Sequence, residues 1–137
     1  MGMYTGLRCH IEVKPEFWPV IEEVMKGFRD EYQNDSDPWE RAAAKFPEYR
    51  WLRCWSNVDR ANFIPFGALA YMPWDDKDPE WEPEKFENGF WKFQCSLKNY
   101  QGEIEYFVET ILKRITLRVC ELYSLYEEDE EPKHIEL

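Results

Sequence analysis

Apolar and polar residues alternate near the start of the chain, and the next stretch has apolar residues at the spacing of a helix. In residues 7–13 every second residue is apolar and the others are charged or polar, which is typical of a strand with one buried face. In residues 17–32 apolar residues recur three and four positions apart, which predicts an amphipathic helix. After a polar break, Asp37 and Pro38 suit the N-cap and the first position of a short helix over 38–46.

The middle of the chain gives weaker patterns. Residues 48–65 follow neither period and are interpreted as an ordered loop, whereas the compact apolar run 66–72 predicts a second strand. Residues 73–88 are acidic and contain three prolines, which indicates an excursion rather than a regular element. Asn88-Gly89 is a strong turn signal. The third strand follows it, with its apolar face at Trp91, Phe93, Cys95 and Leu97.

The last third of the chain has the clearest helix. Residues 103–114 keep apolar positions on one stripe, with acids in the first turn and bases in the last, and Asn99 is a candidate cap. Residues 116–126 predict a long fourth strand, and the chain returns through an acidic turn into a short fifth strand over 133–137.

The order of these elements predicts an α+β fold. An antiparallel sheet of four to five strands would carry two main helices on one face, in a split β-α-β (ferredoxin-like) arrangement with a C-terminal β-hairpin. The chain has 137 residues, which suits one domain over 1–137.

Composition narrows the class of protein. No apolar run approaches the roughly 20 residues that a membrane span needs, and no export leader opens the chain. The four cysteines form no C-x-x-C pair and are expected to be free thiols in a reducing compartment. We therefore expect a cytoplasmic protein that is not associated with a membrane.

Negative charge is concentrated in two segments. The formal net charge is -11; residues 74–88 hold seven acids and two bases, and residues 121–137 hold seven acids and one base. The rest of the chain is neutral, so direct binding to nucleic-acid phosphates is not expected. An acidic excursion at 73–88 and an acidic hairpin at 121–137 suit a basic partner, or they only keep the protein soluble.

No familiar catalytic or metal-binding motif is present. The chain lacks the nucleophile-elbow, phosphate-loop, zinc-protease and dinucleotide-binding patterns, and its carboxylates lack calcium-loop spacing. His10 lies on the polar face of the first predicted strand and is interpreted as structural. We expect no catalytic residue, no metal site and no cofactor, and hence a protein that is not an enzyme.

A basic, tryptophan-containing segment stands out against the acidic background. Its indoles and guanidinium groups could stack a base and bind a phosphate, or they could contact a protein. Alternatively, the indoles pack on the core and the arginines pair with the protein's own acids. These candidate ligand-binding residues are Arg50, Trp51, Arg53, Trp55 and Arg60.

The acidic excursion combines carboxylates with two tryptophans. Its prolines limit the entropy lost when it is fixed against a partner, the acids would steer the encounter, and the rings would supply buried area. The alternative is that both indoles fold back onto the sheet. The candidate protein-binding residues are Trp74, Asp75, Asp76, Asp78, Glu80, Trp81 and Glu82.

Two segments carry a resemblance to known proteins. Residues 67–74 (GALAYMPW) and 91–100 (WKFQCSLKNY), with the opening residues 4–7, resemble parts of small proteins encoded by bacteriophages and prophages. The resemblance spans residues 1–14 and 64–137. It implies a phage-encoded α+β protein but transfers no functional residue.

Together these observations favour a non-enzymatic acidic protein that docks on a basic surface of a host protein and inhibits it, as an anti-defence or DNA-mimic inhibitor. One alternative is a binder that sequesters a nucleotide or cyclic nucleotide. Another is a structural or assembly protein of a phage. The sequence is compatible with a monomer or a homodimer.

Overall fold

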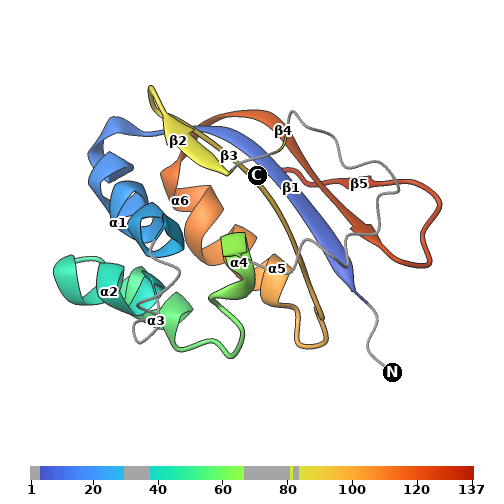
Figure 1. Cartoon of the computed structure of the whole chain (residues 1–137), viewed down its shortest axis with the longest axis horizontal. Coiled ribbons are helices and arrows are strands. Elements are labelled where there is room, and N and C mark those ends of the chain that lie inside the picture. Colours follow the sequence, from blue (N-terminus) through green and yellow to red (C-terminus); the bar gives the residue numbers. More distant parts are fainter. Residues whose placement is uncertain (1–3, 30–37, 67–80, 82–83) are drawn as a thin grey trace.

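The protein is a mixed α+β structure built on one antiparallel sheet (Figure 1). A computed structural model describes residues 4–29, 38–66, 81 and 84–137. The five strands are ordered β2-β3-β1-β4-β5, and all neighbours are antiparallel. They are β1 (Thr5–Val13), β2 (Lys85–Glu87), β3 (Phe90–Leu97), β4 (Thr116–Tyr126) and β5 (Lys133–His134).

The helices lie together against one face of this sheet, as Figure 1 shows. The last three helical segments follow one another without a break, and the middle one has π-helical hydrogen bonding. None of the helices in the described part of the chain is long and apolar enough to span a bilayer. The helical elements are η1 (Pro15–Phe17), α1 (Trp18–Arg29), α2 (Pro38–Lys45), α3 (Arg50–Ser56), α4 (Phe63–Phe66), α5 (Glu103–Phe107), η4 (Val108–Leu112) and α6 (Lys113–Ile115).

Strand β1 occupies the centre of the sheet because its alternation supplies one fully apolar face. Leu7, Cys9, Ile11 and Val13 are all completely buried beneath the helices. The predicted first, third and fourth strands are confirmed, as are the helices beginning near residues 17, 38 and 103. The proposed N-cap Asp37 lies outside the described residues.

The core is centred on the indole of Trp39. This ring is fully buried and makes edge or tilted contacts with the rings of Trp55, Trp91 and Phe107 at centroid distances of 5.9–6.3 Å. Its Nε1 donates a hydrogen bond of 2.6 Å to the carbonyl oxygen of Ile64. This hydrogen bond offsets the cost of removing the indole N–H from water.

The interpretation of residues 48–65 as a loop is wrong, because this stretch contains α3 and α4. In α3 the buried side chains are Leu52, Trp55 and Ser56, which share one side of the helix. A helix of seven residues offers too few apolar positions to show a helical period in the sequence.

The interpretation of residues 73–88 as lacking any element is wrong at its end, where β2 forms and pairs with β3. The predicted turn is confirmed: Asn88 (φ 54°) and Gly89 (φ 83°) are both left-handed, as a two-residue hairpin turn requires. β2 gives no signal in the sequence because it is a three-residue edge strand with two exposed charges. Of the predicted strand 66–72, Phe66 belongs to α4 and the rest lies outside the described residues.

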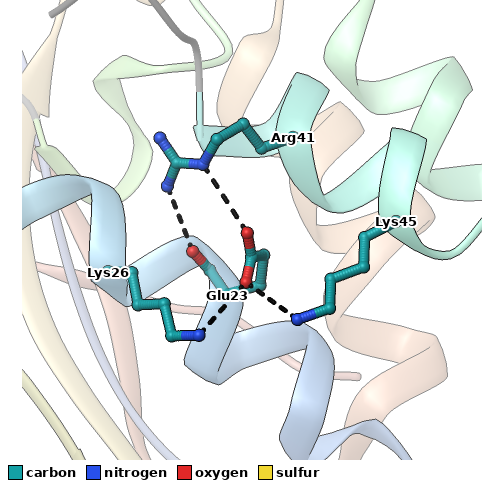
Figure 2. Close-up of polar contacts among 4 residues, drawn as sticks. All are labelled: Glu23, Lys26, Arg41 and Lys45. Atoms are coloured by element: carbon teal, nitrogen blue, oxygen red, sulfur yellow. Dashed lines mark hydrogen bonds and ion pairs between the residues drawn. The ribbon is translucent and has the colours of Figure 1, made fainter. Parts of the chain in front are cut away.

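One carboxylate links α1 to α2. Figure 2 shows Glu23 among three cations: its oxygens lie 3.3 Å from Lys45 Nζ, 3.6 Å from Lys26 Nζ and 3.7 Å from Arg41 Nε. Arg41 also donates a hydrogen bond to the Glu23 carbonyl oxygen. Burial opposes ionisation, but the hydrogen bond from Lys45 and the three positive charges outweigh it and hold the pKa of Glu23 below its ordinary value.

We expect Glu23→Gln to lower the free energy of unfolding by about 1–2 kcal/mol near neutral pH, because three cations lose their shared partner. The folded-state pKa of Glu23 is lowered, so its contribution is complete above the ordinary value of 4.5 and is lost as the pH falls through the folded value. Urea titrations near pH 7 and near pH 3 should therefore show a difference between wild type and variant that shrinks in acid.

The matched control is Glu109→Gln, which removes an exposed Glu109–Lys113 pair of 2.7 Å on the last helix. It should change the free energy of unfolding by at most about 0.5 kcal/mol. A Glu23→Gln effect of the same size at both pH values would contradict the role assigned to this carboxylate.

Candidate functional site

Of the seven predicted protein-binding residues, the structure describes only Trp81. Trp74, Asp75, Asp76, Asp78, Glu80 and Glu82 lie outside the described residues. Trp81 is 2% exposed, and its ring packs on the face of the sheet opposite the helices. The Arg8 guanidinium and the Lys92 ammonium lie 5.3 Å and 5.0 Å from its ring centroid, and the Tyr123 ring meets it edge-on.

Trp81 therefore follows the alternative in which the indole folds back onto the sheet. A ring that is 2% exposed and already contacts two cations of the sheet offers no surface to a partner, which corrects its expected role as a docking side chain. Its contribution is to pack the polar face of the sheet.

The structure does not bring the five predicted ligand-binding residues together. Arg50 and Arg53 are exposed on α3, but Trp55 is fully buried in the core and cannot serve as a stacking plane. Trp51 is half-buried against other aromatic rings. Arg60 is ion-paired with the buried Glu103 and lines a hollow beside Tyr4 and Phe63, outside α3.

The acidic hairpin presents its charges to solvent. In the acidic turn, which we define as Glu127–Glu131, every side chain except that of the half-buried Asp129 is exposed. Within the described residues none of these carboxylates forms an ion pair. The turn is held by two backbone hydrogen bonds, from Glu127 N–H to the Tyr4 carbonyl (3.1 Å) and from Asp129 N–H to the Tyr126 carbonyl (2.9 Å).

A hollow of about 270 Å³, the end pocket, adjoins the acidic turn. The register explains why distant segments meet there: Thr5 pairs with both Leu97 and Tyr126, so the start of β1 lies between the end of β3 and the end of β4. The loop before α5 closes the remaining side. The lining residues are Thr5, Asn99, Tyr100, Glu105, Ser124, Tyr126, Asp129 and Lys133.

Asn99 holds one acidic side chain of the end pocket in place. Its Oδ1 accepts a hydrogen bond of 2.8 Å from the Ile104 N–H, and its Nδ2 donates to the two Glu105 oxygens at 3.1 and 3.0 Å. The N-cap residue of α5 is Gly102 and not Asn99 as expected, but the Asn99 side chain still satisfies one N–H group of the first turn. Because the same amide fixes the Glu105 carboxylate, this charge is preorganised at the rim of the pocket.

The end pocket lies in a negative potential. Burial, followed by the charges of Glu128, Tyr100, Glu127 and Asp129, raises the pKa of the Tyr126 phenol above its ordinary value of 10.0. Tyr100, at the rim, is 58% exposed. The site therefore combines the held carboxylate of Glu105 and the neighbouring acidic turn with an accessible aromatic ring, which suits a cationic side chain or a basic surface.

The titratable groups of β1 have the properties of structural residues. Burial, with smaller contributions from Cys95 and Cys120, raises the pKa of the Cys9 thiol well above its ordinary value, so this thiol is not a nucleophile. Burial and the charge of Lys92 lower the pKa of His10, which keeps its ring neutral near pH 7. All four cysteines are free thiols. No group of three His, Cys, Asp or Glu side chains among the described residues could hold a metal ion.

The sequence does not predict the end pocket, because its lining residues come from segments that lie far apart in the chain. The net charge of 121–137 was the one usable signal. The contribution of Thr5 and Asn99 depends on strand register, which no local pattern reveals.

Comparison of the chain with models of protein families, with curated proteins and with solved structures finds no match in any of the three.

Proposed function

We propose that this protein is a non-enzymatic binding protein whose acidic turn and end pocket dock onto a basic surface of another protein. The observation that carries this proposal is the set of exposed carboxylates of Glu127–Glu131, which form no ion pair within the described residues, beside a hollow with the exposed ring of Tyr100.

The physical roles of these groups differ. Carboxylates steer a basic partner over roughly one Debye length, about 8 Å at physiological salt, and so raise the association rate. Tyr100 and Tyr126 provide aromatic area, which typically supplies the energy at the centre of an interface. The backbone bonds of the turn and the Asn99–Glu105 contacts reduce the conformational entropy lost on binding.

The concrete version rests on the resemblance to phage-encoded proteins. In it, the partner is a basic host protein in the host cytoplasm, such as a defence or nucleic-acid enzyme, which the acidic surface inhibits. Asp75, Asp76, Asp78 and Glu80 belong to this version as a second acidic contribution. The strand order β2-β3-β1-β4 with helices on one face supports assigning the domain to the split β-α-β (ferredoxin-like) class, with β4 and β5 as its C-terminal hairpin.

We expect a variant with amides in the acidic turn to lose its partners. Changing Glu127, Glu128, Glu130 and Glu131 to Gln removes four unpaired charges, and should weaken capture of basic proteins from a bacterial lysate by about tenfold or more at low salt. Immobilised protein and quantitative mass spectrometry measure this loss directly.

The chain offers a control with the same change in net charge. Glu16, Glu22, Glu40 and Glu48 are exposed on the helical side, and their replacement by Gln should leave capture unchanged. Equal capture by the wild type and the turn variant, or an equal loss of capture in the turn variant and the control, would contradict the proposal.

A further inference from the structure

A second hollow, which we call the Arg60 pocket, has the opposite charge. It has a volume of about 220 Å³ and lies between the turn after α3, the short α4 and the end of β3. Two bases and no acid line it, although the net charge of the protein is -11. The lining residues are Tyr4, Arg60, Phe63, Ser96, Leu97 and Lys98.

Arg60 is held in this pocket by a buried acid. Its Nη1 lies 3.6 Å from Oε1 of Glu103, which is 1% exposed and also accepts a hydrogen bond of 3.3 Å from the Gln101 N–H. The second oxygen of Glu103 is buried without a hydrogen-bond partner in the described structure. Glu103 therefore acts as a positioning residue: its carboxylate fixes the guanidinium, whose remaining N–H groups can serve a ligand.

The backbone at Arg60 is also unusual. Its φ of 70° lies in the left-handed region, which is unfavourable for a residue with a side chain. Residues kept in such a conformation by their surroundings are concentrated at functional sites. Here the conformation delivers a cation to the wall of a hollow.

The other wall is aromatic. The Lys98 ammonium lies 5.7 Å from the centroid of the Tyr4 ring, and Phe63, one turn after Arg60, is 40% exposed. Tyr4 and Phe63 give the pocket aromatic surface against which a ring could bury apolar area, and Arg60 and Lys98, which line the same pocket, suit a negative group.

We propose that the Arg60 pocket binds a small phosphomonoester whose molecule also contains a flat aromatic ring, such as an aryl phosphate or a nucleoside monophosphate. The pocket is smaller than the roughly 300–1,000 Å³ of typical ligand sites, so it suits a ligand no larger than a mononucleotide and excludes a dinucleotide. This inference goes beyond the proposed function and uses none of the residues of the acidic turn. Of the five ligand-binding residues expected from the sequence, it retains Arg60.

The test is a titration of the full chain with phenyl phosphate, adenosine 5′-monophosphate and inorganic phosphate, followed by amide NMR shifts. We expect shifts at Phe63, Ser96 and Lys98 with at least one of the two ring-bearing probes, and weaker binding of inorganic phosphate. Lys98→Gln should weaken binding of that probe by about tenfold, because one charge-assisted contact is lost.

The control is Lys113→Gln, which removes the same charge from α6, outside the pocket, and should leave the affinity unchanged. A double variant, Arg60→Gly with Glu103→Gln, suits the left-handed backbone and leaves no unpaired buried charge; it should stay folded by circular dichroism and lose binding. No shift with either ring-bearing probe at millimolar concentration, or equal affinity in wild type and Lys98→Gln, would overturn the proposal.

Discussion

Trp39→Ala is expected to lower the free energy of unfolding by about 3–5 kcal/mol, the largest effect of any single substitution considered for this protein. The fully buried indole contacts three other core rings, and its removal leaves a cavity that α2, α3 and β3 cannot jointly close. The Ile64 carbonyl also loses its 2.6 Å hydrogen bond. Urea unfolding followed by far-ultraviolet circular dichroism measures the loss without relying on tryptophan fluorescence.

Two companion variants separate the effects of the lost apolar volume, the lost N–H donor and the position of the ring in the core. Trp39→Phe keeps most of the apolar volume and removes the N–H donor, so it should cost less than Trp39→Ala. Trp51→Ala removes a half-buried ring of the same size from the edge of the core and should also cost less. If Trp51→Ala were as damaging as Trp39→Ala, the core would not be centred where we place it.

Gly89→Ala is expected to lower the free energy of unfolding by about 2–4 kcal/mol for two separate reasons. The φ of 83° is unfavourable for any residue with a Cβ, and an added Cβ would lie 2.5 Å from Cζ2 of Trp18. Trp18 cannot move freely, because its Nε1 donates a hydrogen bond of 2.8 Å to the Val13 carbonyl. The Gly89 carbonyl in turn accepts the Val13 N–H.

Gly102→Ala provides the matched comparison. Gly102 has a similar φ of 72°, but its added Cβ would meet only a Glu105 oxygen at 3.5 Å, which is an ordinary contact. This variant should therefore lose only about 1–2 kcal/mol, the backbone term alone. Equal losses in the two urea titrations would show that the collision with Trp18 contributes nothing.

The elements that could be predicted are those with one continuous buried face. The alternation of β1 and the apolar spacing of the helix from Glu103 onward reflect burial against the same core. The pattern of apolar residues therefore predicts both elements. The π-helical segment Val108–Leu112 was not predictable, because apolar residues three and four positions apart occur in both kinds of helix.

The elements that were missed are short and depend on distant contacts. α3 is a helix because Trp55 inserts beside Trp39 and Phe107 in the core, and β2 is a strand because β3 offers it an edge. The same limit applies to the sites. Charge singled out residues 121–137 in the sequence, but the hollow beside them arises from strand register, and the pairing of Arg60 with Glu103 joins residues far apart in the chain.

A single short segment lines both hollows. Ser96, Leu97 and Lys98 face the Arg60 pocket, while the next two residues, Asn99 and Tyr100, face the end pocket. Occupants of the two hollows are therefore energetically linked wherever either one displaces this segment. If an anion bound in the Arg60 pocket changes the affinity of the end pocket for a protein partner by some factor, the partner changes the affinity of the Arg60 pocket for the anion by the same factor.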